Sequence, residues 1–204
     1  MLLADQVEFR DAADESSFSW DASGWFGKDL TKLWIKTEGE RESGETEEAE
    51  LQFLYSKAVA TYWDFQVGVR HDFQPSSDRT WAAIGLQGLA PYFFETDIAL
   101  FISESGRTAL RLEAEYELLL TQRLILSPEI EVNFYGQNDP AIGIGSGLSN
   151  IEAGLRLRFE IRREFAPYIG VNWQRDLGGT ADFVRAAGGD TSDTQWVLGV
   201  RAWF

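Results

Sequence analysis

The chain has 204 residues, 25% of them charged, and a formal net charge of −15 at pH 7. This acidic balance excludes a nucleic-acid partner, because binding to phosphates calls for a basic surface. No stretch approaches the roughly 18 to 20 consecutive apolar residues that a transmembrane helix needs.

Segments in which apolar and polar residues alternate recur along the whole chain, and this period of two is typical of strands. Polar or glycine-containing segments separate them. In chain order we predict strands at Gln6–Arg10, Phe18–Phe26, Leu33–Arg41, Glu48–Lys57, Trp63–Phe73, Trp81–Leu89, Phe94–Ile102, Ala109–Leu118, Leu124–Tyr135, Asn150–Ile161, Phe165–Arg175 and Gln195–Phe204. Ala109–Leu118 is rich in helix-forming residues, but its alternation fits a period of two and not 3.6.

The stretch Asn150–Ile161 indicates what kind of sheet these strands form. It alternates strictly for a dozen residues between an apolar face and a charged or glycine face. A strand of this length, rising about 3.3 Å per residue and tilted, can cross a hydrocarbon layer. The closing segment Gln195–Phe204 repeats the pattern and ends on an aromatic residue. Aromatic residues make up 14% of the chain, which suits girdles at two membrane interfaces.

The predicted connections alternate between long and short, as they should in an outer-membrane barrel. The longer ones lie around Asp11, Gly44, Ser76, Ser105, Asp139 and Gly188, and the short ones around Lys28, Ala60, Pro91, Gln122 and Glu164. We therefore predict one domain over residues 1–204, an all-β, transmembrane, antiparallel up-and-down β-barrel of about twelve strands with both termini in the periplasm. The first five residues do not resemble a signal peptide, so we expect a mature or trimmed chain.

With the apolar side facing lipid, the alternation places charged residues in the lumen. The acidic candidates are Asp64, Asp72, Glu95, Asp97, Glu113, Glu115, Glu117, Glu129, Glu131 and Glu152. The basic candidates are Arg70, Arg111, Arg156, Arg158 and Arg201, and we expect Arg111, Arg156, Arg158 and Arg201 to form one cluster on adjacent strands. These charges either pair across the interior and fill it, or the acidic excess favours cations along it.

The single histidine, His71, falls on the predicted lipid face, where we expect a residue of the membrane interface. A serine mechanism needs a histidine hydrogen-bonded to its nucleophile, so this position argues against an enzyme. Gly143–Gly147 is glycine-rich, but no helical pattern follows it, and we interpret it as a loop and not a nucleotide site.

Several stretches of the chain, spread over nearly its whole length, resemble copper resistance protein B of Gram-negative bacteria. They are Trp34–Glu40, Thr46–Gln52, Gly68–Phe73, TWAAIGLQGLAP from Thr80, TALRLEAEYELLL from Thr108, GIGSGL from Gly143, EAGLRLR from Glu152, RREFAPYIG from Arg162 and the closing TQWVLGVRAWF. The resemblance is therefore more specific than any one short motif.

The resemblance implies an outer-membrane protein of copper tolerance that works beside a periplasmic multicopper oxidase and has copper as ligand or cargo. It also implies an N-terminal segment rich in methionine and histidine, suited to Cu(I). This sequence holds only Met1 and His71 as weak candidates of that kind. The alternative function is a passive structural barrel whose lumen is plugged by ion pairs.

Overall fold

The computed structural model describes residues 1–12, 16–42, 45–73 and 78–204, with only the backbone described for residues 45–48. Its strands are β1 (Leu2–Asp11), β2 (Ser16–Lys28), β3 (Thr31–Glu42), β4 (Glu45–Ala60), β5 (Trp63–Phe73), β6 (Arg79–Ala90), β7 (Phe94–Ser103), β8 (Thr108–Glu115), β9 (Leu118–Leu119), β10 (Leu124–Tyr135), β11 (Gly147–Phe159), β12 (Phe165–Asp176) and β13 (Ser192–Trp203). A 3₁₀ turn, η1 (Pro91–Phe93), and one α-helix, α1 (Gly178–Ala187), complete the elements of the described chain.

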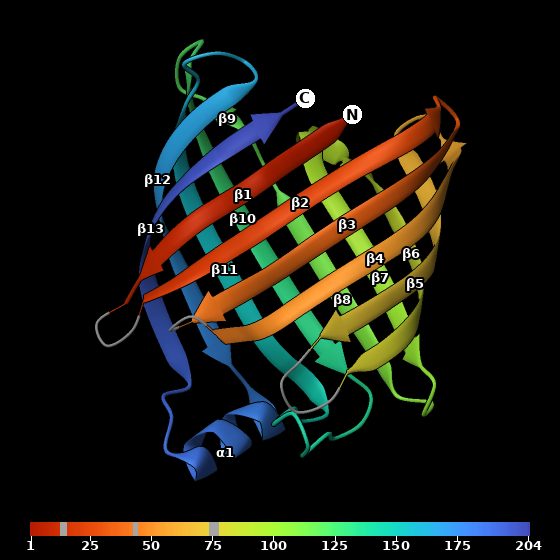
Figure 1. The fold of residues 1–204 in the computed structure, drawn as a ribbon, viewed down its shortest axis with the longest axis vertical. Helices are drawn as coiled ribbons and strands as arrows, with labels where there is room; N and C mark the ends of the chain where they lie inside the picture. Colours follow the sequence, from red (N-terminus) through yellow and green to blue (C-terminus); the bar gives the residue numbers. More distant parts are fainter. Residues whose placement is uncertain (13–15, 43–44, 74–77) are drawn as a thin grey trace.

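The strands form one closed antiparallel sheet (Figure 1). Consecutive strands pair with each other from β1 to β8 and from β10 to β13, and β13 returns to pair with β1. β8 and β9 both pair with β10 and together occupy one position in the wall. The predicted twelve-stranded transmembrane barrel is thus confirmed, with one strand broken into two pieces.

The break between β8 and β9 lies opposite a proline. Tyr116 and Glu117 leave the strand, although the amide of Tyr116 still donates to the carbonyl of Pro128 on β10 at 3.0 Å. Proline has no N–H, so β10 has no hydrogen-bond donor at Pro128. The ladder between this broken strand and β10 therefore lacks one backbone donor at this position.

Alternation sets the two faces of the wall as the sequence predicts. On β11, Leu155 is 48% exposed and points outward, whereas Arg156 beside it is 4% exposed and points inward. The outer surface carries many exposed apolar side chains, such as Phe53, Val69 and Leu198. A belt of this kind is stable in lipid and would be unstable in water.

The two ends of the barrel differ. Both termini lie at one end, where Phe204 and Leu2 exchange backbone hydrogen bonds of 2.8 and 2.9 Å and close the seam. The opposite end carries α1 and the long loop that follows β10 (Figure 1). The predicted loops around Gly44 and Ser76 lie outside the described residues.

Most predicted strand boundaries shift by a few residues, and two predictions need a larger correction. The first strand begins at Leu2 and not at Gln6, because β2 and β13 on its two sides pair with its apolar start as well. The predicted loop before the last strand contains α1, which ends at Gly188 in a left-handed conformation with φ 87°. The described helix is too short and too polar to cross a membrane.

Candidate functional site in the barrel lumen

The barrel encloses a cavity of about 470 Å³. Eleven acidic and four basic residues line it, together with neutral residues such as Trp34 and Gln87. The basic lining residues come from β1, β3, β8 and β13, so the positive charge is spread around the wall. The lining has a clear acidic excess.

Glu50 on β4 is the centre of the first ion-pair network, and only 8% of its surface is exposed. Arg70 on β5 contacts it at 2.8 Å, and Arg111 reaches it from β8 with two hydrogen bonds of 3.0 and 3.3 Å. Gln52 donates to the same carboxylate at 2.6 Å. We call these four residues the Glu50 network.

Further contacts fix the two arginines of the Glu50 network. Arg70 donates to Asp72 at 2.6 Å, and Arg111 donates to Glu38 at 3.0 Å. Both guanidinium groups also lie over the ring of Phe101, at 4.6 and 5.9 Å from its centre. The result is a brace of side chains across the lumen between β3, β4, β5 and β8.

A second network surrounds Glu8 on β1, whose side chain is fully buried. Arg10 donates to it at 3.0 Å, Tyr168 on β12 donates at 3.0 Å, and Arg156 on β11 also binds it. The same arginines bring in two predicted residues, because Arg156 contacts Glu129 at 2.7 Å and Arg10 contacts Glu152 at 3.3 Å.

Glu8 and Arg10 face the lumen but are not among the residues predicted from the sequence. The signal was present, since Gln6, Glu8 and Arg10 share the polar face of the first predicted strand. Only the closure of β13 onto β1 brings that face against β11.

A third network lies nearer the end with the termini. Glu117, just after the break in β8, accepts hydrogen bonds from Arg158 at 2.5 Å and Arg201 at 2.8 Å. Arg201 also contacts Asp5 at 2.6 Å.

The predicted single basic cluster is therefore wrong in part. Arg156, Arg158 and Arg201 do lie on the same side of the lumen, on β11 and β13. Arg111 instead joins Arg70 on the Glu50 network, because its long side chain reaches across the lumen to β4. The order of strands does not show which side chains are long enough to contact the opposite wall of the lumen.

The remaining candidate acids differ in how well they are neutralised. Asp97 accepts a hydrogen bond from Lys36 at 2.6 Å, and Asp64 one from Lys32 at 3.3 Å. The ion-pair contacts of Glu113 and Glu131 are both with Arg111 and are longer, at 3.8 and 3.5 Å. Glu131 also accepts a hydrogen bond from Asn133 at 2.5 Å.

Three acids of the cavity lining make no ion pair with any residue that the structure describes. They are Asp21, Glu95 and Glu115. The interior is therefore braced by ion pairs but not neutralised by them.

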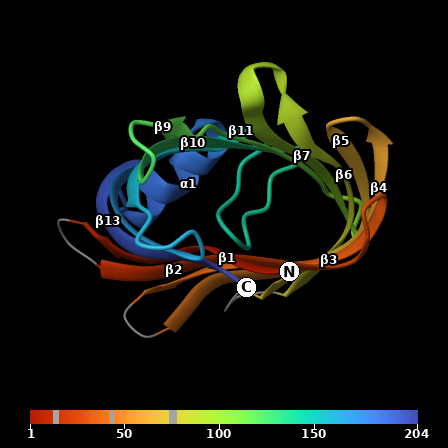
Figure 2. The same cartoon turned by 90° about the horizontal axis from the view of Figure 1, so that it is seen from above.

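The loop from Gly136 to Ser146 is tied down at the end opposite the termini. Asp139 is 3% exposed and contacts Arg79 of β6 at 2.7 Å and Arg107 at 3.2 Å. The amide of Gly145 donates to the hydroxyl of Thr180 in α1 at 2.9 Å. Viewed along the barrel, this loop lies within the outline of the wall (Figure 2). It narrows that mouth of the lumen.

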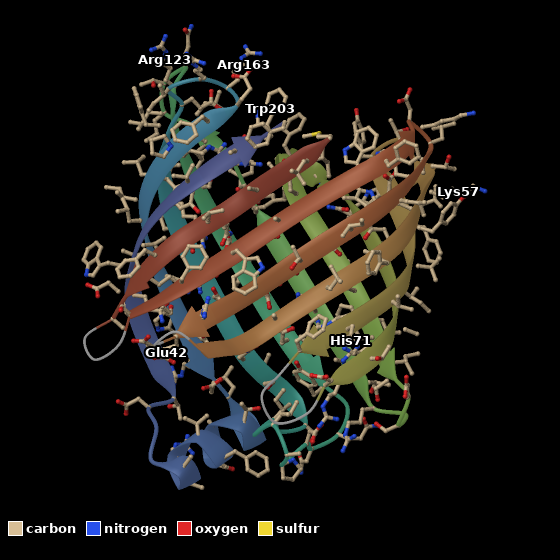
Figure 3. The ribbon with its side chains drawn as sticks, viewed as in Figure 1. Glu42, Lys57, His71, Arg123, Arg163 and Trp203 are labelled. Atoms are coloured by element: carbon tan, nitrogen blue, oxygen red, sulfur yellow. The ribbon has the colours of Figure 1, made fainter. Side chains whose placement is uncertain are left out.

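The two weak metal-ligand candidates do not meet. Met1 is 58% exposed at the rim with the termini. His71 lies toward the other end (Figure 3), accepts or donates a hydrogen bond with Thr80 at 2.9 Å, and packs on Phe73 on the outer face. Within the described residues, no group of three or more His, Cys, Asp or Glu side chains is arranged to hold a metal ion.

The sequence of this barrel matches a known protein family. The model of the family described as "Copper resistance protein B precursor (CopB)" matches residues 1–204. The chain belongs to this family. It is 51% identical over 204 residues to "Copper resistance protein B" of Escherichia coli, and 52% identical over 203 residues to "Copper resistance protein B homolog" of Pseudomonas syringae pv. tomato. Each match covers all of this chain and 69% of the relative.

Solved structures with the same fold are outer-membrane proteins. The NanC porin has a TM-score of 0.67 at 13% identity, with all of both chains covered. The KdgM porin has a TM-score of 0.58 at 11% identity, covering all of this chain and 99% of the porin. Outer membrane phospholipase A of Escherichia coli has a TM-score of 0.59 at 12% identity, covering 98% of this chain and 92% of that one. This member of the CopB family is a barrel of the bacterial outer membrane.

Proposed function

We propose that this barrel takes part in copper homeostasis by binding copper ions in its lumen or by passing them across the outer membrane. The observation that supports this is the acidic excess of the cavity lining, eleven acids against four bases. A low-dielectric wall around charges of one sign concentrates ions of the other sign. Family membership identifies copper as the cation to test first.

The same lining argues against the anionic cargo of a structural neighbour. KdgM has been solved in complex with oligogalacturonate, a chain of sugar carboxylates. An acidic lumen would repel such a polyanion. We therefore expect the lumen of this chain to favour cations over such a ligand.

The proposed setting follows from the fold and the resemblance. We propose that the end with both termini and the short turns faces the periplasm, where a multicopper oxidase would be the partner. We further propose that the barrel is not an enzyme. Its one histidine lies on the outer face, packed on Phe73 and away from the lumen.

A passive structural barrel is the second candidate, favoured by the three ion-pair networks that cross the lumen. Copper flux separates the two functions. Liposomes that carry the barrel and an entrapped copper indicator should take up copper faster than empty liposomes, and the detergent-solubilised barrel should bind copper in equilibrium dialysis. Flux equal to that of empty liposomes together with no binding would refute the copper proposal and leave the passive barrel.

A further inference from the structure

Six acidic residues and two glutamines, one from each of eight strands, stand opposite one another in a continuous row. In register from one strand to the next, the acids of the row are Asp64, Asp97, Glu113, Glu131, Glu152 and Asp193. Gln87 fills the row between Asp64 and Asp97, and Gln174 fills it between Glu152 and Asp193. We call these residues the carboxylate row.

The carboxylate row leads from one mouth of the barrel to the other. Asp64 is the second residue of β5, which starts at the end with the termini. Asp193 is the second residue of β13, which starts at the end with α1 (Figure 1). Residues directly opposite on neighbouring strands are about 5 Å apart. The strands are tilted relative to the barrel axis, so a row that follows the hydrogen bonds from strand to strand winds around the inner wall from one mouth to the other.

The central part of the row lines the cavity. Gln87, Asp97, Glu113, Glu131 and Glu152 all belong to the lining of the 470 Å³ space. Oxygen atoms on the row are thus open to a solute in the lumen and not buried in the wall.

Among the acids of the row that line the cavity, Glu113 and Glu131 have the longest ion-pair contacts. Asp97 has Lys36 at 2.6 Å and Glu152 has Arg10 at 3.3 Å, whereas the ion-pair partner of both Glu113 and Glu131 is Arg111, at 3.8 and 3.5 Å. Glu131 also accepts a hydrogen bond from the neutral amide of Asn133 at 2.5 Å. The Nε of Arg111 makes no hydrogen bond. Arg111 supplies one positive charge for two carboxylates in register, so the pair keeps a net negative charge that favours a further cation.

An oxygen atom without a donor lies beside Glu152, the next acid of the row. Asn172 on β12 is 1% exposed, and its amide nitrogen donates to Glu152 at 2.9 Å. That bond leaves its Oδ1 buried and without a hydrogen-bond partner among the described residues. A buried carbonyl oxygen is stable when it accepts a hydrogen bond or coordinates a cation.

From these observations we propose that the carboxylate row is the path by which oxygen-preferring divalent cations cross the barrel, and that it carries copper as Cu(II) and not as Cu(I). Carboxylate and amide oxygens suit harder cations, whereas Cu(I) selects thiolate and thioether ligands. The chain has no cysteine, and its one methionine and one histidine are not on the row. The identification of copper as the cation rests on the proposed function, whereas the path along the carboxylate row does not.

The test neutralises two neighbouring acids on the row and two matched acids off it. The row variant is Glu113→Gln/Glu131→Gln, which are opposite each other on β8 and β10. The control is Glu95→Gln/Glu115→Gln, which are opposite each other on β7 and β8, line the same cavity and have no ion-pair partner among the described side chains. Both variants remove two negative charges from one space.

Reversal potentials in planar bilayers with Cu(II) or Ca²⁺ gradients give the preference for divalent cations over chloride. We expect the row variant to lower this preference by about tenfold and the control to lower it by less than about twofold. Equal losses would overturn the row, because bulk charge alone would then set the preference. Circular dichroism and heat-modifiable gel mobility check folding, and Glu113→Gln alone serves if the double variant does not fold.

The cation series separates this inference from the proposed function. Passage of Ca²⁺ that depends on the row, with neither passage nor binding of Cu(II), would refute the copper function and leave the row as a path for other divalent cations. Passage of Cu(II) that is equally reduced in both variants would refute the path and leave the copper function. Ag(I), in nitrate salts, stands in for Cu(I), and passage of Ag(I) at or above the Cu(II) rate would refute the assignment of Cu(II).

Discussion

Glu50→Gln should be among the most destabilising single changes in the lumen, because it removes the anion that two buried arginines share. Glu50 makes an ion pair with Arg70 at 2.8 Å and accepts two hydrogen bonds from Arg111 at 3.0 and 3.3 Å. A glutamine has the same shape but only one oxygen that can accept hydrogen bonds from these guanidinium groups. Its NH₂ group would face the remaining N–H donors of the arginines.

The magnitude follows from what is lost and what remains. A hydrogen bond to a charged group contributes about 1.5 to 3 kcal/mol net. Removing one partner of a buried ion pair costs about 3 to 5 kcal/mol when the other is left alone. Here Arg70 keeps Asp72 and Arg111 keeps Glu38, so neither cation is stranded. We therefore expect the free energy of unfolding to fall by about 2 to 4 kcal/mol.

Reversible urea titration of the barrel in lipid vesicles, followed by the fluorescence of its eight tryptophans, measures this change. The matched control is Glu115→Gln, an acid of the same cavity without an ion-pair partner among the described residues, which should change the free energy by less than about 0.5 kcal/mol. Equal effects of the two substitutions would show that the Glu50 network does not brace the fold.

Three further outcomes are expected. Leu155→Arg, on the outer face of β11, should destabilise the barrel by about 2 to 4 kcal/mol in vesicles, and Phe159→Arg at the end of the same strand by about 0 to 1 kcal/mol; equal costs would contradict the depth we assign to the belt. Asp139→Asn should weaken the contacts with Arg79 and Arg107, free the loop after β10 and raise the single-channel conductance, and an unchanged conductance would mean that this loop does not narrow the mouth. Deletion of Phe204 removes the hydrogen bonds with Leu2 at the seam and should lower the amount of folded barrel in the membrane without changing the conductance of inserted molecules; a normal yield would show that the terminal residue is dispensable for assembly.

Alternation alone was enough to predict the fold class and the orientation of the faces. Leu155 and Arg156 show why, because adjacent residues of a strand must point to opposite sides, and only one of these two is compatible with lipid. The strand count was predictable for the same reason. α1 was not, because its ten residues begin with two glycines and form too short an apolar stripe to stand out from a loop.

The contacts within the lumen were less predictable than its composition. Each candidate acid could be named from its strand, but the partner of Arg111 depends on which strands face each other and on how far a side chain reaches. The carboxylate row likewise depends on the register of every pair from β5 to β13, which turn lengths and strand tilt set together. A single strand contributes only one residue to it.

The register that builds the row also limits how such a chain can vary in length. One residue inserted into any of the eight strands that the row crosses would turn every later side chain of that strand to the opposite face. Acids would then meet lipid and apolar groups would meet the lumen, so the insertion would disrupt the membrane belt and the row together. Insertions between strands carry no such penalty. Length differences among functional relatives should therefore fall in the connections, and above all at the mouth with the long loops.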